Sequence, residues 1–198
     1  MRDPVTGSGQ NRQHIRRHGW RNRVMPVLVA TLLACMPAFG GIAGQPATEY
    51  RIKTAFLYNF TSFVTWPKDP AGASGFTLCV LGDDPFGNLL DKLAGKSVNG
   101  TRLEVRRLGS LALLEQCKLV FISATSSDQI GDALALLHDL PVLTVSDIRG
   151  FTARGGIIEF RIIANKVRFD INLGAAESAG LSISSKLLSL ATRFRRND

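Results

Sequence analysis

Polar side chains follow two apolar stretches of this 198-residue chain and are its strongest candidates for binding chemistry. Residues 76–81 are followed by Gly-Asp-Asp-Pro-Phe-Gly, and residues 142–145 by Ser-Asp. Both stretches are typical of buried strands, and ligands of parallel sheets bind beyond the carboxyl ends of the strands. Two aspartates disfavour a phosphate ligand, and no nucleotide-binding glycine motif is present. We predict that a partner-binding or ligand-binding edge is made of Asp83, Asp84, Phe86, Ser146, Asp147 and Arg149. The alternative for the first loop is a plain capped turn.

Catalytic and metal chemistry find little support in the same chain. Beyond residue 43 the only histidine is His138, and no second ligand lies at metal-binding spacing from it. A phosphoacceptor domain, which Asp83 and Asp84 suggest, needs an aspartate after the third strand, where this chain has Ser123-Ala124-Thr125. We therefore predict no catalytic residues, no metal, no cofactor and no enzymatic activity.

Aromatic residues recur at helical spacing over residues 48–65. We expect Phe56, Phe60 and Phe63 in the core. Tyr58 and Trp66 fit equally well in the core or as exposed aromatic contacts for a partner, because aromatic side chains also anchor interfaces.

Residues 1–43 have the pattern of a secretory signal peptide. Four arginines between positions 16 and 23 precede an apolar stretch over 24–35, and small residues follow. This order is typical of export signals, and the apolar stretch is too short to span a bilayer. We predict Sec export with cleavage after Ala43, which leaves residues 44–198 as the domain. A lipid anchor on Cys35 is the alternative.

Cys79 and Cys117 are then the only cysteines of the exported chain. An isolated pair in an oxidising compartment usually forms a disulfide bond. The chain-entropy description gives such a bridge about 4 kcal/mol of stabilisation. Two buried free thiols are the alternative.

The chain carries a formal net charge of +8, but the excess lies at its N-terminus. Residues 1–43 hold six of the 24 basic residues and one of the 16 acidic residues, which leaves 18 basic and 15 acidic. Because nucleic-acid binding needs a basic surface on the folded part, we expect no nucleic-acid partner. Hydrophobic residues make up 45% of the chain and charged residues 20%, which favours a globular domain over a disordered chain.

Strands and helices alternate along most of the remaining sequence. The spacing predicts helices over 48–65, 84–93, 111–115 and 126–140, and strands over 76–81, 103–108, 118–122 and 142–145. Gly155-Gly156 precedes an antiparallel hairpin, 157–163 with 167–173, and a final helix over 175–193, with a kink or break near Gly180 as the alternative. We expect one α/β domain with core 48–192, a mostly parallel sheet flanked by helices, with a C-terminal antiparallel hairpin and a final helix.

Several stretches together resemble the YfiR family of periplasmic proteins, also called the DUF4154 domain. The resemblance covers about residues 48–192 and depends on the order and spacing of the stretches. They are Tyr50-x-x-Lys53-x-Ala55-Phe56-Leu57-Tyr58-Asn59-Phe60 before Trp66-Pro67, Cys79 to Gly87, Cys117 with Phe121-Ile122-Ser123, Leu143 to Asp147 with Phe151 and Gly155-Gly156, Asn165 to Asn172, and Ala179 to Leu188.

The resemblance implies a periplasmic regulator that represses an inner-membrane diguanylate cyclase through its periplasmic sensor domain, which lowers cyclic di-GMP and biofilm formation. It also implies sequestration by an outer-membrane lipoprotein, a homodimer, and a stabilising bridge at Cys79 and Cys117. Some members carry a second disulfide, for which this chain has no cysteines. The alternative is a periplasmic protein that binds a small ligand at the predicted edge and serves a histidine kinase or a transporter.

Overall fold

Two sheets organise the computed structural model, which describes residues 45–67 and 75–196. The main sheet contains β2 Phe76–Leu81, β3 Ser97–Val98, β4 Thr101–Leu108, β5 Leu119–Ile122, β6 Leu143–Ser146, β7 Ile158–Ile163, β8 Lys166–Asn172 and β10 Arg193–Arg195. These eight strands lie in the order β10-β8-β7-β6-β5-β2-β4-β3. The small sheet pairs β1 (Val64–Thr65) with β9 (Ser182–Ile183) in antiparallel fashion.

The main sheet is mostly parallel, as the sequence predicts. The pairs β2–β4, β2–β5, β5–β6 and β6–β7 are parallel. The hairpin β7–β8 is antiparallel, β10 lies parallel to β8, and β3 lies antiparallel to β4. The predicted strands are all present, with ends that differ by up to two residues. The expected α/β domain with a C-terminal hairpin is therefore confirmed.

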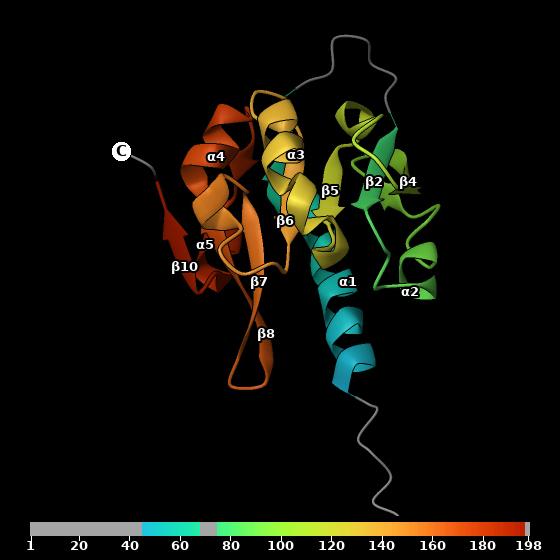
Figure 1. The fold of residues 1–198 in the computed structure, drawn as a ribbon, viewed down its shortest axis with the longest axis horizontal. Helices are drawn as coiled ribbons and strands as arrows, with labels where there is room; N and C mark the ends of the chain where they lie inside the picture. The colour runs from blue at the N-terminus through green and yellow to red at the C-terminus, as the bar shows by residue number, and fades with distance from the viewer. Residues whose placement is uncertain (1–44, 68–74, 197–198) are drawn as a thin grey trace, which may run out of the picture. The chain divides into compact units, whose positions relative to one another are not determined.

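Helices cover both faces of the central strands (Figure 1), α1 behind the sheet and α3 in front of it. The helices are α1 Gln45–Phe63, α2 Asn88–Asp91, α3 Ile130–Leu137, α4 Leu173–Ser178 and α5 Ser185–Leu190, with short 3-10 helices at Leu114–Gln116, Ala124–Gln129 and Thr152–Arg154. Alternate residues of β2 enter two different cores. Leu78 and Val80 share a core with Phe60 of α1, whereas Leu81 shares one with Ala133 of α3.

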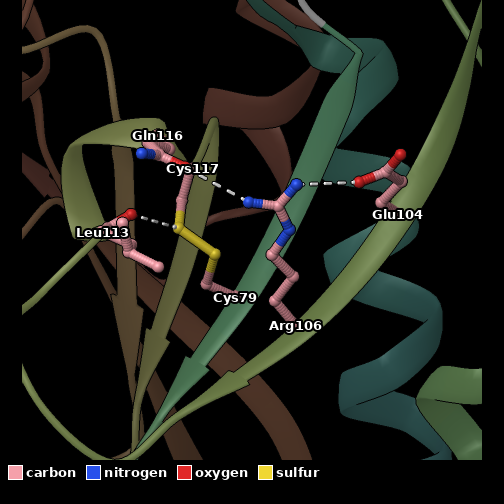
Figure 2. The surroundings of a disulfide bond; sticks show 6 residues. All are labelled: Cys79, Glu104, Arg106, Leu113, Gln116 and Cys117. Carbon is pink, nitrogen blue, oxygen red and sulfur yellow. Dashed lines mark hydrogen bonds and ion pairs between the residues drawn. A yellow bond between two sulfur atoms is a disulfide. The ribbon is translucent and has the colours of Figure 1, made fainter.

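A disulfide bond between Cys79 and Cys117 lies in the core on the α3 side (Figure 2), where both residues are buried. It joins β2 to the turn that leads into β5, the neighbouring strand. Arg106 of β4 lies opposite Cys79 in register, and its guanidinium donates hydrogen bonds to Glu104 and Gln116. The bridge thus ties two of the central strands together at their amino-terminal side.

The helix predicted over 84–93 is wrong in its length and its start. Only Asn88–Asp91 is helical, and Gly87 precedes it with a φ of 53°. The carboxylate of Asp84 accepts the backbone N–H of Phe86 at 2.7 Å, which closes a turn inside the loop instead of capping a helix. The helix therefore begins only after the turn has ended.

The final helix predicted over 175–193 is not continuous, because the segment breaks at Gly180, the alternative given for this helix from the sequence. Gly180 has a φ of 67°. Its N–H donates to the carbonyl of Glu177, and the N–H of Leu181 donates to the carbonyl of Ala176. This pair of hydrogen bonds is the Schellman arrangement that ends helices. Strand β9, helix α5 and strand β10 follow, so the chain returns to the sheet edge.

Smaller differences concern the other predicted helices. Helix α1 ends at Phe63, and residues predicted as its last turn form β1. The helix predicted over 111–115 is a 3-10 turn at Leu114–Gln116, and the one over 126–140 divides into a 3-10 segment and α3. The predicted signal peptide, residues 1–43, and its alternative anchor Cys35 lie outside the described residues and stay predictions.

Removal of the disulfide tests its contribution to stability. The variant Cys79→Ser/Cys117→Ser should lose about 4 kcal/mol of unfolding free energy, since the bridge closes a loop with a sequence separation of 38. Urea denaturation followed by circular dichroism measures the loss. Dithiothreitol should destabilise the wild type by a similar amount and leave the variant unaffected. Equal stability of variant and wild type under oxidising conditions would contradict the structural role.

Candidate functional site

A buried lysine of the first helix lies at the centre of the predicted edge. Lys53 is 2% exposed, although it lies on a helix that faces the core. Its Nζ atom lies 2.5 Å from Oε1 of Glu49, one turn earlier, and 2.5 Å from Oδ2 of Asp147. A buried ammonium needs such partners, because an unpaired charge in the interior costs several kcal/mol. Asp147 follows β6, so the pair joins α1 to the carboxyl end of the sheet.

Ser146 holds the turn that presents Asp147. The Ser146 side chain is fully buried; its hydroxyl donates to the carbonyl of Ile122 at 2.7 Å and accepts the N–H of Ile148 at 3.1 Å. These bonds fasten the end of β6 to the end of the neighbouring β5. The carboxylate of Asp147 therefore has a defined position over the sheet edge.

Tyr50 completes the network from the same helix. Its hydroxyl donates to Oδ2 of Asp147 at 3.0 Å, and the Lys53 ammonium lies 4.3 Å from the centre of its ring. The ring meets Phe86 edge-on at 5.2 Å between centroids, and Phe86 meets Phe121 of β5 at 4.7 Å. Burial raises the pKa of Tyr50 above its usual range, and the negative charge of Asp147 raises it further.

Hydrogen bonds and ion pairs of Asp83 and Asp84 hold the loop after β2 in place. The backbone N–H of Asp83 donates to Oγ1 of Thr125 at 2.9 Å, while the Asp83 side chain is exposed. Oδ2 of Asp84 accepts Nε of Arg107 at 2.7 Å, and the same guanidinium reaches Asp91 at 2.8 Å. Hydrogen bonds to Asp91 and Asp84 raise the pKa of Arg107 above its usual value.

The structure brings together only part of the predicted edge. Tyr50 contacts both Phe86 and Asp147, and the hydroxyl of Ser146 holds the turn that carries Asp147. Asp83 and Asp84 belong to the separate loop after β2. The exposed Arg149 lines a pocket together with Asp147. A function for these residues in partner or ligand binding stays a prediction.

Sequence reasoning missed Lys53 and Tyr50 as members of the site. A signal for Lys53 was present, because Lys53, Phe56, Phe60 and Phe63 follow each other at intervals of three and four residues. A charged residue in an apolar helical stripe indicates a buried ion pair. Its partner, Asp147, could not be identified from spacing, because it lies far away in the sequence.

Side chains fill the space where open α/β sheets usually bind ligands. Strand order changes direction at β2, whose neighbours are β4 and β5, and ligands of such sheets bind beyond that point. Here Phe86 packs against Phe121 of β5, and Tyr50 packs against Phe86. A pocket of about 390 Å³ lies farther along the edge, beside Lys53, Asp147, Arg149 and Arg161. A second pocket, of about 530 Å³, lies on the outer side of Tyr50 and Phe86 and is also lined by Arg51 and Lys92.

The two aromatic candidates for partner contact are partly buried. The hydroxyl of Tyr58 donates to the carbonyl of Ser97 at 3.2 Å, and Lys96 lies 4.9 Å from its ring centre. The indole N–H of Trp66 donates to the carbonyl of Lys118 at 3.1 Å. Both side chains pack against the core on the α1 side, so each presents only part of its surface to a partner.

Metal and membrane features are both missing from the part of the chain that the structure describes. Within residues 45–67 and 75–196, no three histidine, cysteine or acidic side chains lie together as metal ligands would. His138 follows the end of α3 and is exposed, with Asp139 as its neighbour. Over the same residues, the helices are too short or too polar to cross a bilayer.

Comparison with known proteins identifies relatives at the level of family and fold. A family model described as YfiR/HmsC-like, DUF4154, matches residues 50–192. No curated protein matches the chain. A crystal structure of a conserved domain protein from Vibrio cholerae O1 biovar eltor strain N16961 is similar, with a TM-score of 0.52 and 13% identity. The similarity covers 74% of this chain but only 60% of that one, and at this identity it shows the fold alone.

Substitution of Lys53 tests the buried ion pair. Lys53→Met should cost about 3 kcal/mol of unfolding free energy, because the half-buried Asp147 loses its cation. Lys92→Met, which removes an exposed lysine, is the matched control and should change stability by less than about 0.5 kcal/mol. Addition of Asp147→Asn to Lys53→Met should restore part of the loss. Urea titrations measure all four proteins, and equal effects of the two lysine variants would argue against the pair.

Titration of Tyr50 tests the raised pKa. In a Tyr58→Phe background, Tyr50 is the only tyrosine, and the phenolate absorbance of the folded protein should stay low at about pH 11, where a free tyrosine is mostly ionised. The folded state keeps a proton that the unfolded chain releases, so the free energy of unfolding should fall as the pH rises above 10.0, the ordinary tyrosine pKa. Asp147→Asn should lower the titration midpoint. Ionisation near the ordinary value in the folded wild type would contradict the buried network.

Proposed function

The chain belongs to the YfiR/HmsC-like family, and on this basis we propose that it is a non-catalytic periplasmic regulator that represses an inner-membrane diguanylate cyclase. At the level of the family, membership associates the chain with periplasmic regulation of cyclic di-GMP signalling. The finer proposal is that the protein binds the periplasmic sensor domain of the cyclase and keeps the enzyme inactive. Cellular cyclic di-GMP falls as a result.

The observation that carries the proposal is the family match over residues 50–192, which spans nearly the whole described fold. The geometry of the edge supports it. Tyr50 and Phe86 pack beyond the ends of β2 and β5, and Lys53 is paired with both Glu49 and Asp147. An edge with its polar groups already paired favours a surface for protein contact over a reaction centre.

Two exposed side chains of the predicted edge belong to turns that hydrogen bonds hold in place. Asp83 follows β2 in the loop that Thr125 fastens, and Arg149 follows the turn that Ser146 fastens. We propose that they contact the partner, since rigid turns lower the conformational entropy lost on binding. Export to the periplasm, sequestration by an outer-membrane lipoprotein and homodimerisation belong to the same proposal and derive from the family.

Deletion of the gene tests the repression. Intracellular cyclic di-GMP should rise in the deletion strain, because the cyclase loses its inhibitor, and a plasmid copy of the wild type should reverse the rise. The Cys79→Ser/Cys117→Ser variant should complement poorly, since loss of the bridge destabilises the fold. The control is a signal-less wild-type copy, which should not complement if the protein acts outside the cytoplasm.

An unchanged level of cyclic di-GMP in the deletion strain would contradict repression of a cyclase. The ligand-binding alternative would then gain support from the pocket of about 390 Å³ beside Asp147 and Arg149. Full complementation by the signal-less copy would contradict the periplasmic location.

A further inference from the structure

A wide cleft lies beside the last strand and adjoins the edge described above, with which it shares Arg149. It has a volume of about 740 Å³ and runs along the five consecutive residues 191–195 of the C-terminal segment. Its other walls come from the turn after β6 and from β7 and β8. The cleft is partly open to solvent, whereas small-molecule sites usually enclose most of the ligand.

Four arginines line this cleft, and two of them are free. Arg161 donates to Oδ2 of Asp170 at 2.9 Å, a bond that raises the pKa of Arg161, and Arg195 donates to the carbonyl of Thr152. Arg149 and Arg193 are exposed, and neither has an acidic partner within the described ranges. These two guanidinium groups are available to an external anion.

The two acidic side chains of the cleft do not compensate for Arg149 and Arg193, because both are buried; of their oxygens, Oδ1 of Asp170 has no hydrogen-bond partner among the described residues. Glu159 is 4% exposed and accepts the backbone N–H groups of Gly150 and Thr152. Asp170 is 7% exposed and holds Arg161. The accessible charge of the cleft is therefore positive, and guanidinium groups bind carboxylates in a bidentate geometry.

Strand β10 adds a second feature of a protein-docking surface. It is the terminal strand of the sheet, so its outer side has no strand partner among the described residues. All three residues are exposed, and Phe194 is 60% exposed. A free strand edge offers unpaired backbone groups to an extended chain, and an exposed aromatic ring offers an apolar contact.

We propose that this cleft docks an extended acidic segment of the partner protein, with Arg149 and Arg193 binding its carboxylates. The length of the cleft, the free edge of β10 and Phe194 favour a peptide chain over a small free anion. The inference rests on the proposed function, because that function supplies a protein partner. It adds where on this chain the partner binds and what chemistry the bound segment has.

Binding of a labelled hexaglutamate peptide to the exported protein tests the site directly. Fluorescence anisotropy should show binding at low ionic strength that weakens at about 0.15 M salt, as expected for exposed charges. Arg149→Gln/Arg193→Gln should weaken the affinity at least about tenfold, since charge-assisted bonds are lost. Arg51→Gln/Arg102→Gln removes the same charge from exposed positions outside the cleft and should change the affinity less than about twofold.

Three results would overturn the proposal. The first is no binding of hexaglutamate, and the second is an equal loss in the two double variants, which would indicate attraction by net charge alone. The third is competition by succinate as strong as that by unlabelled hexaglutamate at equal carboxylate concentration, which would indicate a small-anion site. A hexaglutamine peptide is the neutral control and should not bind.

The cellular readout separates this inference from the proposed function. If deletion raises cyclic di-GMP, the Arg149→Gln/Arg193→Gln variant should fail to restore the low level although it is exported at the wild-type amount. Full complementation by this variant would overturn the inference and leave the repression intact. No effect of the deletion itself would overturn the repression, while the peptide measurements would still decide the chemistry of the cleft.

Discussion

The ion pair between Lys53 and Asp147 is the constraint on which the arrangement of the first helix depends. A lysine in the middle of an apolar helical stripe can be buried only where carboxylates meet it. Glu49 lies on the same helix and moves with it, so of the two carboxylates Asp147, held at the end of β6, is the one that ties the helix to the sheet. Tyr50 then reaches Asp147 and covers Phe86, and the strand-end crevice is filled as a consequence.

The two faces of the sheet are stabilised by different means. On the α1 side, Phe56 and Phe60 pack against Phe160 and Phe169 of the hairpin, with ring centroids between 5.3 and 6.1 Å apart. On the α3 side, a disulfide bond joins the strands that the hairpin does not reach. The C-terminal segment returns to this framework twice, since β9 pairs with β1 after α1 and β10 pairs with β8. It thereby forms the small sheet and the β10 end of the main sheet.

Burial and charge divide the surface into a closed part and an open part. Around Asp147 the polar groups are paired with one another, since Lys53 meets Glu49 and Asp147, and Tyr50 donates to Asp147. Beside β10, the buried acids are engaged while Arg149 and Arg193 remain exposed. A regulator that acts by contact needs a rigid framework and an accessible recognition surface, and the two parts supply these in one domain. The family membership and this separation together favour binding of a protein partner over chemistry at the strand ends.

The sequence by itself determined the elements whose signals are local and the edge at which they end. Apolar runs predicted the parallel strands, and the rule that parallel strands end together predicted that Phe86 and Asp147 lie at one edge. After Ala175, periodicity alone left open whether one helix continues or breaks near Gly180, and the structure shows that the glycine ends the helix by adopting a positive φ. Only the tertiary structure decided which carboxylate neutralises Lys53, and only the return of β10 to β8 placed Arg193 in one cleft with Arg149. Contacts between residues far apart in the chain depend on how the elements pack, and no local pattern contains that information.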